Sequence, residues 1–260
     1  MNVVAKAFTV LKTLGPAQAV KTILRIRNAN DRKIQACLRA KDGLEIGGPS
    51  RFFRKFGIIS AYPAIKSLDG VNFGAKTIWE GDLKRGQHYR WEGAKPGFQY
   101  ITDGTDLSEI ENGRYDFVLS CNSLEHMANP IRALREWARV IKPGGHLLLV
   151  LPNKMNNFDH RRATTTFSHL LDDYHNQVTE EDLSHLDEIL KFHDLSRDPR
   201  AGSFADFKKR SEANVDNRCL HHHVYSLDLL RELLGHINFE VLALGEMKSD
   251  IYIFGQKRTE

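Results

Sequence analysis

Apolar residues form two patterns along this chain, continuous runs and helical spacing, and after residue 43 the two patterns alternate. Continuous apolar runs bounded by glycine or polar residues predict buried strands at 44–46, 98–101, 115–120 and 146–152. A further short strand is expected just before Asp69. Residues 129–141 instead place apolar side chains on one face at helical spacing, with Asn129 as the expected N-cap. The segment 115–152 therefore predicts a strand–helix–strand unit.

The C-terminal part of the chain continues this pattern. Residues 226–237 predict an amphipathic helix capped by Ser226, and 239–246 and 250–257 predict two strands that form a hairpin at the sheet edge. Strands that alternate with helices in this way imply a parallel sheet covered on both faces. The expected fold is therefore α/β: a Rossmann-like, doubly wound, mostly parallel sheet with an antiparallel edge hairpin at the C-terminus.

Two segments depart from the alternation. Residues 3–40 have helical spacing and many basic residues. Residues 155–220 are charged and rich in His and Asp, and they interrupt the strand–helix rhythm. The expected division is a basic helical N-terminal arm over 1–42 and one domain over 43–260, with 155–220 as an insertion or lid over the mouth of the sheet.

Charge is distributed unevenly. The formal net charge is +4, but residues 1–41 alone carry about +8, so the remainder is mildly acidic at about −4. A body that is not basic argues against a nucleic-acid substrate. The arm is expected either to pack on the domain as a helix pair, or to contact an anionic membrane surface or a partner protein.

The cysteines and the hydropathy of the chain indicate where in the cell the protein is expected. The chain has three widely spaced cysteines, no CxxC and no apolar run long enough to span a membrane. A cytoplasmic protein is expected, peripheral at the inner membrane face if the arm binds lipid. No metal site is expected, because the adjacent residues His221, His222 and His223 cannot all point one way; a zinc site that combines them with His160 stays open as an alternative.

Four stretches carry a family resemblance: EIGGPS at 45–50, TDGTDL at 102–107, YDFVLSCNSLEH at 115–126, and LREWARVIKPGGHLLLVLP at 134–152. As a set they resemble the class I S-adenosylmethionine (SAM)-dependent methyltransferases, in the type 11 methyltransferase-domain group. The resemblance implies SAM as cofactor and methyl transfer as the reaction. The additional FDHRR and NRCLHHHV stretches resemble a bacterial subgroup associated with surface-polysaccharide and glycan genes.

The resemblance also implies cofactor-binding residues at the carboxyl ends of the strands. Glu45 is expected to accept from the ammonium group of SAM, through water. Gly47 matches the first glycine of the family's loop, whereas Pro49 stands where a second would be. Asp69 is expected to hold the ribose hydroxyls, with Glu80 as the alternative. The whole expected set is Glu45, Gly47, Gly48, Pro49, Ser50, Asp69, Glu80, Asp106, Leu107, Asn122 and Ser123.

Within that set, Asp106 and Leu107 are expected to hold the adenine, with Asp103 as a competitor for the carboxylate role. Asn122 and Ser123 follow the strand at 115–120, so they are expected to face the sulfonium and the acceptor.

For the reaction, a neutral histidine is expected to take the acceptor's proton, and the candidates are His160, His126 and His223, in that order. Three charged residues of the FDHRR stretch are expected to bind the acceptor: Asp159, Arg161 and Arg162. The expected function is methylation of a small-molecule or glycan acceptor, with a sugar hydroxyl of a surface polysaccharide or its precursor favoured. Two alternatives stay open: a SAM-binding, non-catalytic scaffold of a glycan-assembly complex, and an N- or C-methyltransferase acting on another small metabolite.

Overall fold

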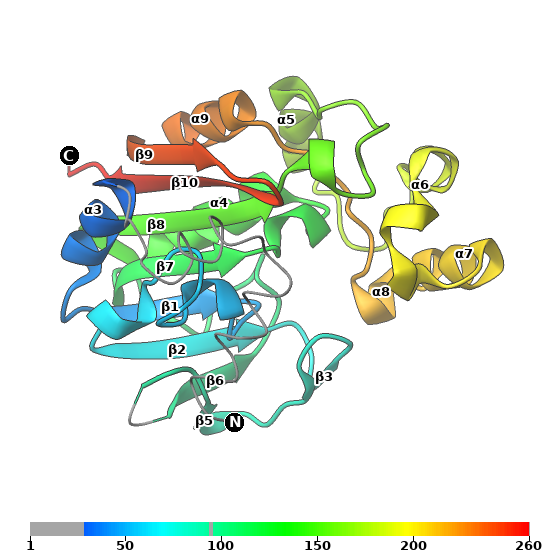
Figure 1. Ribbon diagram of the computed structural model, residues 1–260. Helices are drawn as coiled ribbons and strands as arrows, with labels where there is room; N and C mark the ends of the chain where they lie inside the picture. Colours follow the sequence, from blue (N-terminus) through cyan, green and yellow to red (C-terminus); the bar gives the residue numbers. More distant parts are fainter. Residues whose placement is uncertain (1–28, 94–95, 260) are drawn as a thin grey trace, which may run out of the picture.

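The computed structural model describes residues 29–93 and 96–259, and in these ranges eight strands form one sheet in the order β5-β6-β2-β1-β7-β8-β10-β9 (Figure 1). Strands β6, β2, β1, β7 and β8 are parallel, whereas β5, β10 and β9 each pair antiparallel with a neighbour. The strands are β1 Asp42–Ile46, β2 Ser67–Asn72, β5 Gly86–Tyr89, β6 Gly97–Ile101, β7 Tyr115–Cys121, β8 Ile141–Pro152, β9 Phe239–Glu246 and β10 Asp250–Lys257, with a separate small hairpin of β3 Lys76–Thr77 and β4 Gly81–Asp82. The predicted α/β fold is confirmed.

Helices cover both faces of the sheet. The α-helices are α3 Ala29–Leu38, α4 Pro130–Val140, α5 Phe167–His175, α6 Leu186–Phe192, α7 Phe204–Glu212, α8 Asn214–Asn217 and α9 Leu227–His236. On one face α4, α5 and α9 share a core with the sheet that includes Leu44, Val118 and Leu149. On the other face α3 and the short 3-10 helices η1 Arg51–Phe53 and η2 Tyr62–Ala64 pack around Phe117 and Leu148.

Local signals set the helix boundaries as expected. Asn129 caps α4 by accepting from the backbone N–H of Arg132 at 3.0 Å, and Ser226 caps α9 by accepting from Leu229 at 3.2 Å. Strand β8 begins earlier than expected, at Ile141 rather than at residue 146, because the Lys-Pro-Gly-Gly stretch that ends α4 continues directly into pairing with β7.

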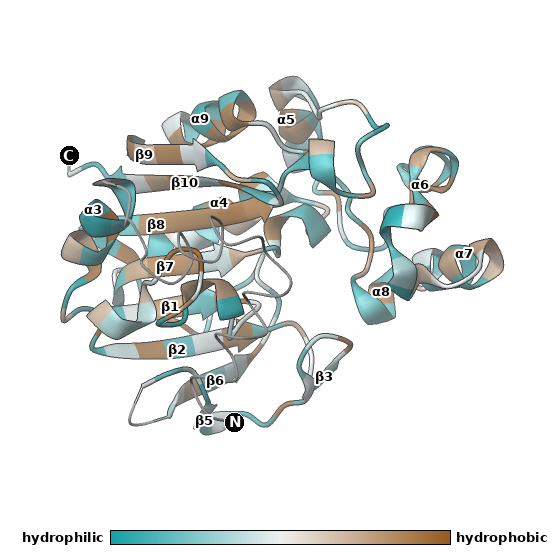
Figure 2. Cartoon of the chain, in the orientation of Figure 1, coloured by the Kyte–Doolittle hydropathy of each residue, from teal (hydrophilic) through white to brown (hydrophobic). Residues whose placement is uncertain are grey.

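The segment 155–220 forms a small lobe of α6, α7 and α8 beyond the carboxyl ends of the parallel strands (Figure 1). It has its own apolar cluster of Ile189, Ala201, Phe207 and Leu220. Figure 2 shows the contrast in hydropathy, with β8 strongly hydrophobic in the sheet and α8 hydrophilic in the lobe. Helix α5 packs on the main core instead, so we call the rest of this segment, residues 155–166 and 176–220, the lid.

The expected N-terminal arm lies outside the described residues up to position 28. From residue 29 the chain forms α3, which buries Ile34 and Leu38 against the sheet. Asn30 donates to the Tyr252 hydroxyl at 2.9 Å, and the Lys33 ammonium donates to the Leu242 carbonyl at 2.9 Å. Helix α3 therefore packs on the domain. Across the part of the chain that the structure describes, no helix has the length and hydropathy needed to span a membrane.

Candidate active site

The loop after β1 meets the loop after β7 at the point where the strand order reverses. Gly47 has a φ of +80°, and a Cβ on it would lie 2.2 Å from the Ser123 Oγ. That hydroxyl donates to the Ile46 carbonyl at 3.1 Å. A Cβ on Gly48 would lie 2.3 Å from the Glu45 Cδ. Both glycines are therefore needed for this close approach, and two predicted residues, Gly47 and Ser123, are brought together.

The Glu45 carboxylate holds this loop through hydrogen bonds. Its side chain is fully buried, Oε1 accepts from the Ser50 N–H at 2.9 Å, and Oε2 accepts from the hydroxyls of Tyr62 at 2.6 Å and Tyr89 at 2.7 Å. Burial raises the pKa of the carboxyl to about 7, against these three hydrogen bonds, which favour the charged form. Both oxygens are thus buried and hold the loop, and the expected contact with the cofactor's ammonium through water stays a prediction.

The rest of the β1 loop turns above Glu45. The Gly48–Pro49 peptide is cis, and the Ser50 hydroxyl accepts from the Phe52 N–H at 3.1 Å, which caps η1. Pro49 and Ser50 are both half-buried. Ser50 is thus used in the turn itself.

At the end of β2 the structure corrects the expected ribose ligand. Asp69 lies mid-strand, opposite Leu44, and its carboxylate accepts from the Phe98 N–H and the Tyr115 hydroxyl, both at 2.7 Å. The residue at the carboxyl end is Asn72, whose amide donates to the Gly48 carbonyl at 3.1 Å. The alternative, Glu80, lies in the β3–β4 turn, where burial raises its pKa despite the charges of Arg54 and Arg51.

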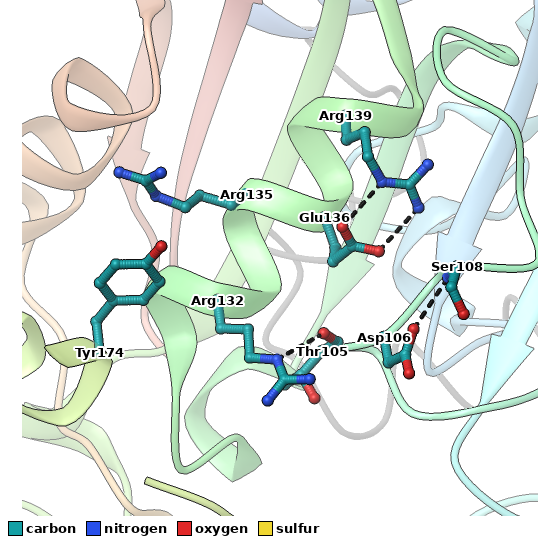
Figure 3. A pocket seen from close by; sticks show the side chains of 8 residues that line it. All are labelled: Thr105, Asp106, Ser108, Arg132, Arg135, Glu136, Arg139 and Tyr174. Atoms are coloured by element: carbon teal, nitrogen blue, oxygen red, sulfur yellow. Dashed lines mark hydrogen bonds and ion pairs between the residues drawn. The ribbon is translucent and has the colours of Figure 1, made fainter. Parts of the chain in front are cut away.

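At the end of β6 the carboxylate in position is Asp103. It accepts from the Thr105 N–H at 2.9 Å and pairs with Arg218 of the lid at 3.0 Å. Asp106 is exposed and accepts from the Ser108 N–H at 3.0 Å. It lines a surface groove of about 560 Å³ beside α4, shown in Figure 3. Leu107 is fully buried in the core. Asp106 is thus corrected in favour of Asp103.

The segment after β7 carries the next two predicted positions and a buried acid. Asn122 has a φ of +51° and donates to Asp250 at 3.4 Å. Glu125 is 1% exposed, and among the described residues neither of its carboxyl oxygens has a hydrogen-bond partner. Burial raises the pKa of Glu125 to about 7, against the effect of the nearby His221. Burial also places the pKa of His126 well below its usual value.

The side chains of the FDHRR stretch, residues 158–162, mainly contact other residues of the protein. His160 is paired with Asp194 at 2.9 Å inside the lid. The Arg162 side chain is 1% exposed and binds Asp159 at 3.1 Å, the His221 carbonyl at 2.7 Å and the His222 carbonyl at 3.0 Å. These contacts correct His160 as the first candidate base and leave neither Asp159 nor Arg162 free for an acceptor. Arg161, whose side chain is 54% exposed, is the accessible one.

The residue that the sequence reasoning missed is His221. Its Nδ1 lies 2.6 Å from the Asp159 Oδ2, in a nearly buried pair. Burial would lower the pKa of His221, but the charge and hydrogen bond of Asp159 outweigh it and raise the pKa. The same contacts hold the pKa of Asp159 at about 2 although burial opposes this. The His221 ring lies 4.6 Å from that of His126, so the pair adjoins the segment after β7.

His223 turns away from this centre. Its ring is buried, and Nε2 lies 3.2 Å from the Ala128 carbonyl and 3.6 Å from Asp173 on α5. The expectation of His223 as a base is corrected, because its ring is held against the Ala128 carbonyl and Asp173 of α5.

Aromatic side chains on one side and the lid on the other cover the carboxyl ends of the strands. The exposed Trp79, in the loop after β2, stacks at a tilt on His126 with ring centroids 5.1 Å apart, and Phe73 lies 6.4 Å from Trp79. From the lid, Arg218 lies over the Phe73 ring at 5.5 Å while it pairs with Asp103. Aromatic side chains and the lid thus meet above the ends of β2, β6 and β7.

Comparison with known proteins identifies a methyltransferase domain in part of the chain. A family model described as a methyltransferase domain matches residues 67–149. No curated protein matches the chain. Similar solved structures include a putative methyltransferase from Bacillus halodurans, 14% identical with a TM-score of 0.47 and coverage of 89% of this chain and 98% of that one. A putative S-adenosylmethionine dependent methyltransferase from Listeria monocytogenes is 12% identical with a TM-score of 0.49 and coverage of 88% and 97%.

The matched segment runs from β2 to β8 and includes Asn72, Asp103 and the segment after β7, whereas the loop after β1 precedes it. Residues 67–149, about a third of the chain, thus match a methyltransferase domain, and S-adenosylmethionine is the cofactor expected of such a domain.

Proposed function

We propose that this enzyme methylates a hydroxyl group of a sugar-type acceptor, and that His221, oriented by Asp159, takes the proton from that hydroxyl. The observation that carries the proposal is the 2.6 Å contact between the His221 Nδ1 and the Asp159 Oδ2, next to the end of β7. The acceptor of greatest interest is a sugar of a surface polysaccharide or its precursor, as the sequence resemblance suggests.

The residues at the strand ends fit the cofactor in chain order. The Gly47–Gly48 turn allows close approach of backbone to a ligand, the Asn72 amide suits the ribose hydroxyls, and the Asp103 carboxylate suits the adenine amine. The buried Glu125 carboxylate, which has no hydrogen-bond partner among residues 29–93 and 96–259, fits a cationic ligand. S-adenosylmethionine, when bound, supplies a methyl group already activated by its sulfonium.

With the donor already activated, the protein's main tasks are alignment and removal of a proton. A hydroxyl is a weak nucleophile until its proton is taken. Donation of the His221 Nδ1–H to Asp159 fixes the tautomer and leaves the Nε2 lone pair as the base. Asp159 and the neighbouring Glu125 then stabilise the imidazolium that forms, because both are acids close to the ring.

The aromatic cover supports a sugar as the acceptor. Trp79 is 45% exposed although it lies over His126, and Phe73 extends the same aromatic surface. A flat aromatic face packs well against the C–H face of a sugar ring, while the ring's hydroxyls reach polar groups nearby. Arg161 offers an accessible cation for a phosphate or carboxylate on the same molecule.

The base is tested with His221→Gln, which keeps a donor toward Asp159 but removes the base. We expect kcat to fall by roughly 10²–10⁴-fold while the affinity for S-adenosylhomocysteine, measured by isothermal titration, stays as in the wild type. His160→Ala is the matched control and should keep full activity. Full activity in His221→Gln, or a loss in His160→Ala alone, would contradict the assignment.

The acceptor class is tested with labelled SAM and a panel of nucleotide-linked hexoses, oligosaccharides and small amines. We expect label in the sugars, and NMR of the product should place the methyl carbon on oxygen. Label confined to amines, or a methyl group on nitrogen or carbon, would favour the N- or C-methyltransferase alternative. Trp79→Ala should raise KM for the sugar more than it lowers kcat.

A further inference from the structure

A second group of metal-type ligands lies away from the reaction centre, between helix α5 and the lid. It consists of His169 and Asp173 on α5, His185 at the start of α6, and His223 before α9, and we call it the α5 cluster. Each residue offers one ligand atom, and these four atoms all lie within 4.8 Å of one another. Such a convergence of three imidazoles and one carboxylate is unusual in a protein interior.

The distances within the cluster match the shell of one ion. The Nε2 atoms of His169 and His185 are 3.0 Å apart, and the Asp173 Oδ2 lies 3.4 Å from the His169 Nε2. Zinc bonds of about 2.0–2.1 Å in a tetrahedron place neighbouring ligand atoms about 3.3–3.4 Å apart. The observed separations lie around that value.

Hydrogen bonding alone does not account for the cluster. An N–H···N bond between His169 and His185 would satisfy only those two atoms. Within the described ranges the buried Asp173 Oδ2 has no hydrogen-bond partner, and neither has the His223 Nδ1. His223 is 2% exposed and Asp173 is 8% exposed, so bulk water does not satisfy them either. A cation would supply the missing partner to both.

The surroundings also suit a metal ion. The His223 Nε2 lies 3.2 Å from the Ala128 carbonyl, and the His185 Nδ1 lies 3.8 Å from the Glu188 carboxylate. Histidines that bind a metal through one ring nitrogen are commonly oriented in this way, by a carbonyl or a carboxylate at the other nitrogen.

We infer that His169, Asp173, His185 and His223 bind one zinc ion that fastens the lid to α5 and to the segment before α9. Three nitrogen ligands and one oxygen ligand suit zinc, and four protein ligands leave no open position, so the site is structural rather than catalytic. It joins three segments that are distant in sequence, and one of its ligands stands two residues from His221. The metal therefore holds the base in place without entering the reaction.

The test measures metal on the full chain and needs no acceptor. Protein stripped with a chelator is titrated with ZnCl₂ by calorimetry, and its content is measured by mass spectrometry. We expect one equivalent of zinc, and a tetrahedral Co²⁺ absorption spectrum when cobalt replaces it. His169→Ala should weaken zinc binding by more than roughly 100-fold, since losing a ligand costs more than losing an orienting partner. His175→Ala, on the exposed side of the same helix, should bind zinc as the wild type does.

Further variants keep the test decisive. Asp173→Asn removes the charge with little change in shape, and exposed Asp172→Asn is its matched control, so this pair serves if His169→Ala does not fold. His221→Gln should keep the full equivalent of zinc. Wild-type protein that binds no zinc, or His169→Ala and Asp173→Asn proteins that bind it normally, would overturn the inference. Loss of zinc in His221→Gln with retention in His169→Ala would overturn it too, by placing the metal at Glu125, His126 and His221.

Discussion

The substitution Glu45→Gln separates two roles that an acid at the end of β1 can have: holding the loop, or contacting the cofactor directly. The Glu45 carboxyl is fully buried and accepts three hydrogen bonds, from Ser50, Tyr62 and Tyr89. Burial nevertheless raises its pKa from 4.5 to about 7. Glutamine can accept from Ser50 with its oxygen and donate to a tyrosine hydroxyl with its nitrogen, so it imitates the protonated acid at every pH.

The raised pKa makes the stability of the folded protein depend on pH. Between pH 4.5 and about 7 the folded protein keeps a proton that the unfolded chain has released, so the free energy of unfolding falls as the pH rises through this window. At about 1.4 kcal/mol for each pKa unit, the Glu45 contribution reaches about 3 kcal/mol above pH 7. Stability is fully retained below pH 4.5. Glu45→Gln removes this slope, so the variant is expected to be more stable than the wild type at pH 8 and similar to it near pH 4.5.

The assay is urea unfolding of both proteins at several pH values from 5 to 8. Glu125, whose pKa is also raised to about 7, adds the same slope to both proteins, so only the difference between their curves is attributed to Glu45. Glu240→Gln, at an exposed position on β9, controls for the loss of one charge. Parallel curves for wild type and Glu45→Gln would refute the reasoning and mean that the three hydrogen bonds keep Glu45 ionised. Retained SAM affinity in Glu45→Gln would support a loop-holding role, whereas its loss in a stable protein would mean direct contact with the cofactor.

Two further substitutions test the loop and the lid. Arg162→Ala should lower the free energy of unfolding by about 3–5 kcal/mol, because it leaves Asp159 and two carbonyls without their buried partner. The control, Arg161→Ala at an exposed position, should change it by about 0.5 kcal/mol or less. Equal effects of the two substitutions in denaturant titrations would contradict the buried role of Arg162. Gly47→Ala should weaken SAM binding about tenfold, because a φ of +80° disfavours a side chain by about 1–2 kcal/mol and its Cβ meets the Ser123 hydroxyl. Calorimetry with Ser123→Gly added should recover part of that loss, and wild-type affinity in Gly47→Ala would show that the loop adapts.

The elements that the sequence predicted well are those set by local forces. Strands β7 and β8 are continuous apolar runs, and both predicted caps, Asn129 and Ser226, make the expected side-chain hydrogen bonds. Periodicity and capping are properties of neighbouring residues, so they can be read without tertiary structure. The predicted methyltransferase domain rested on the same local patterns, and the family model matches residues 67–149.

Positions that depend on strand register and turn geometry were less predictable. Asp69 was placed by its distance from Gly47 along the chain, but pairing of Ile46 with Val71 sets the end of β2 at Asn72. In the turn after β6, Asp103 accepts from the Thr105 N–H and so lies at the strand end, which the sequence could not separate from Asp106.

The lid was the least predictable part because its side chains find partners far away in sequence. Residue types indicated charged clusters, but only the fold pairs His221 with Asp159, which is 62 positions away. One signal was available: His169 and Asp173 are four residues apart, which places them on one face of a helix. Without the positions of His185 and His223 that spacing is common and carries little information.

The three consecutive histidines explain how the lid and the reaction centre are connected. His221 binds Asp159, His222 contacts Asn214 of the lid at 3.1 Å, and His223 faces the α5 cluster. The three side chains point to different structures, so one short segment contacts all three at once. Arg162 binds the carbonyls of His221 and His222 and also pairs with Glu188 of α6 at 3.3 Å. A shift of α6 would therefore pull on the backbone of the proposed base, and we expect the position of the lid to affect the geometry of proton removal.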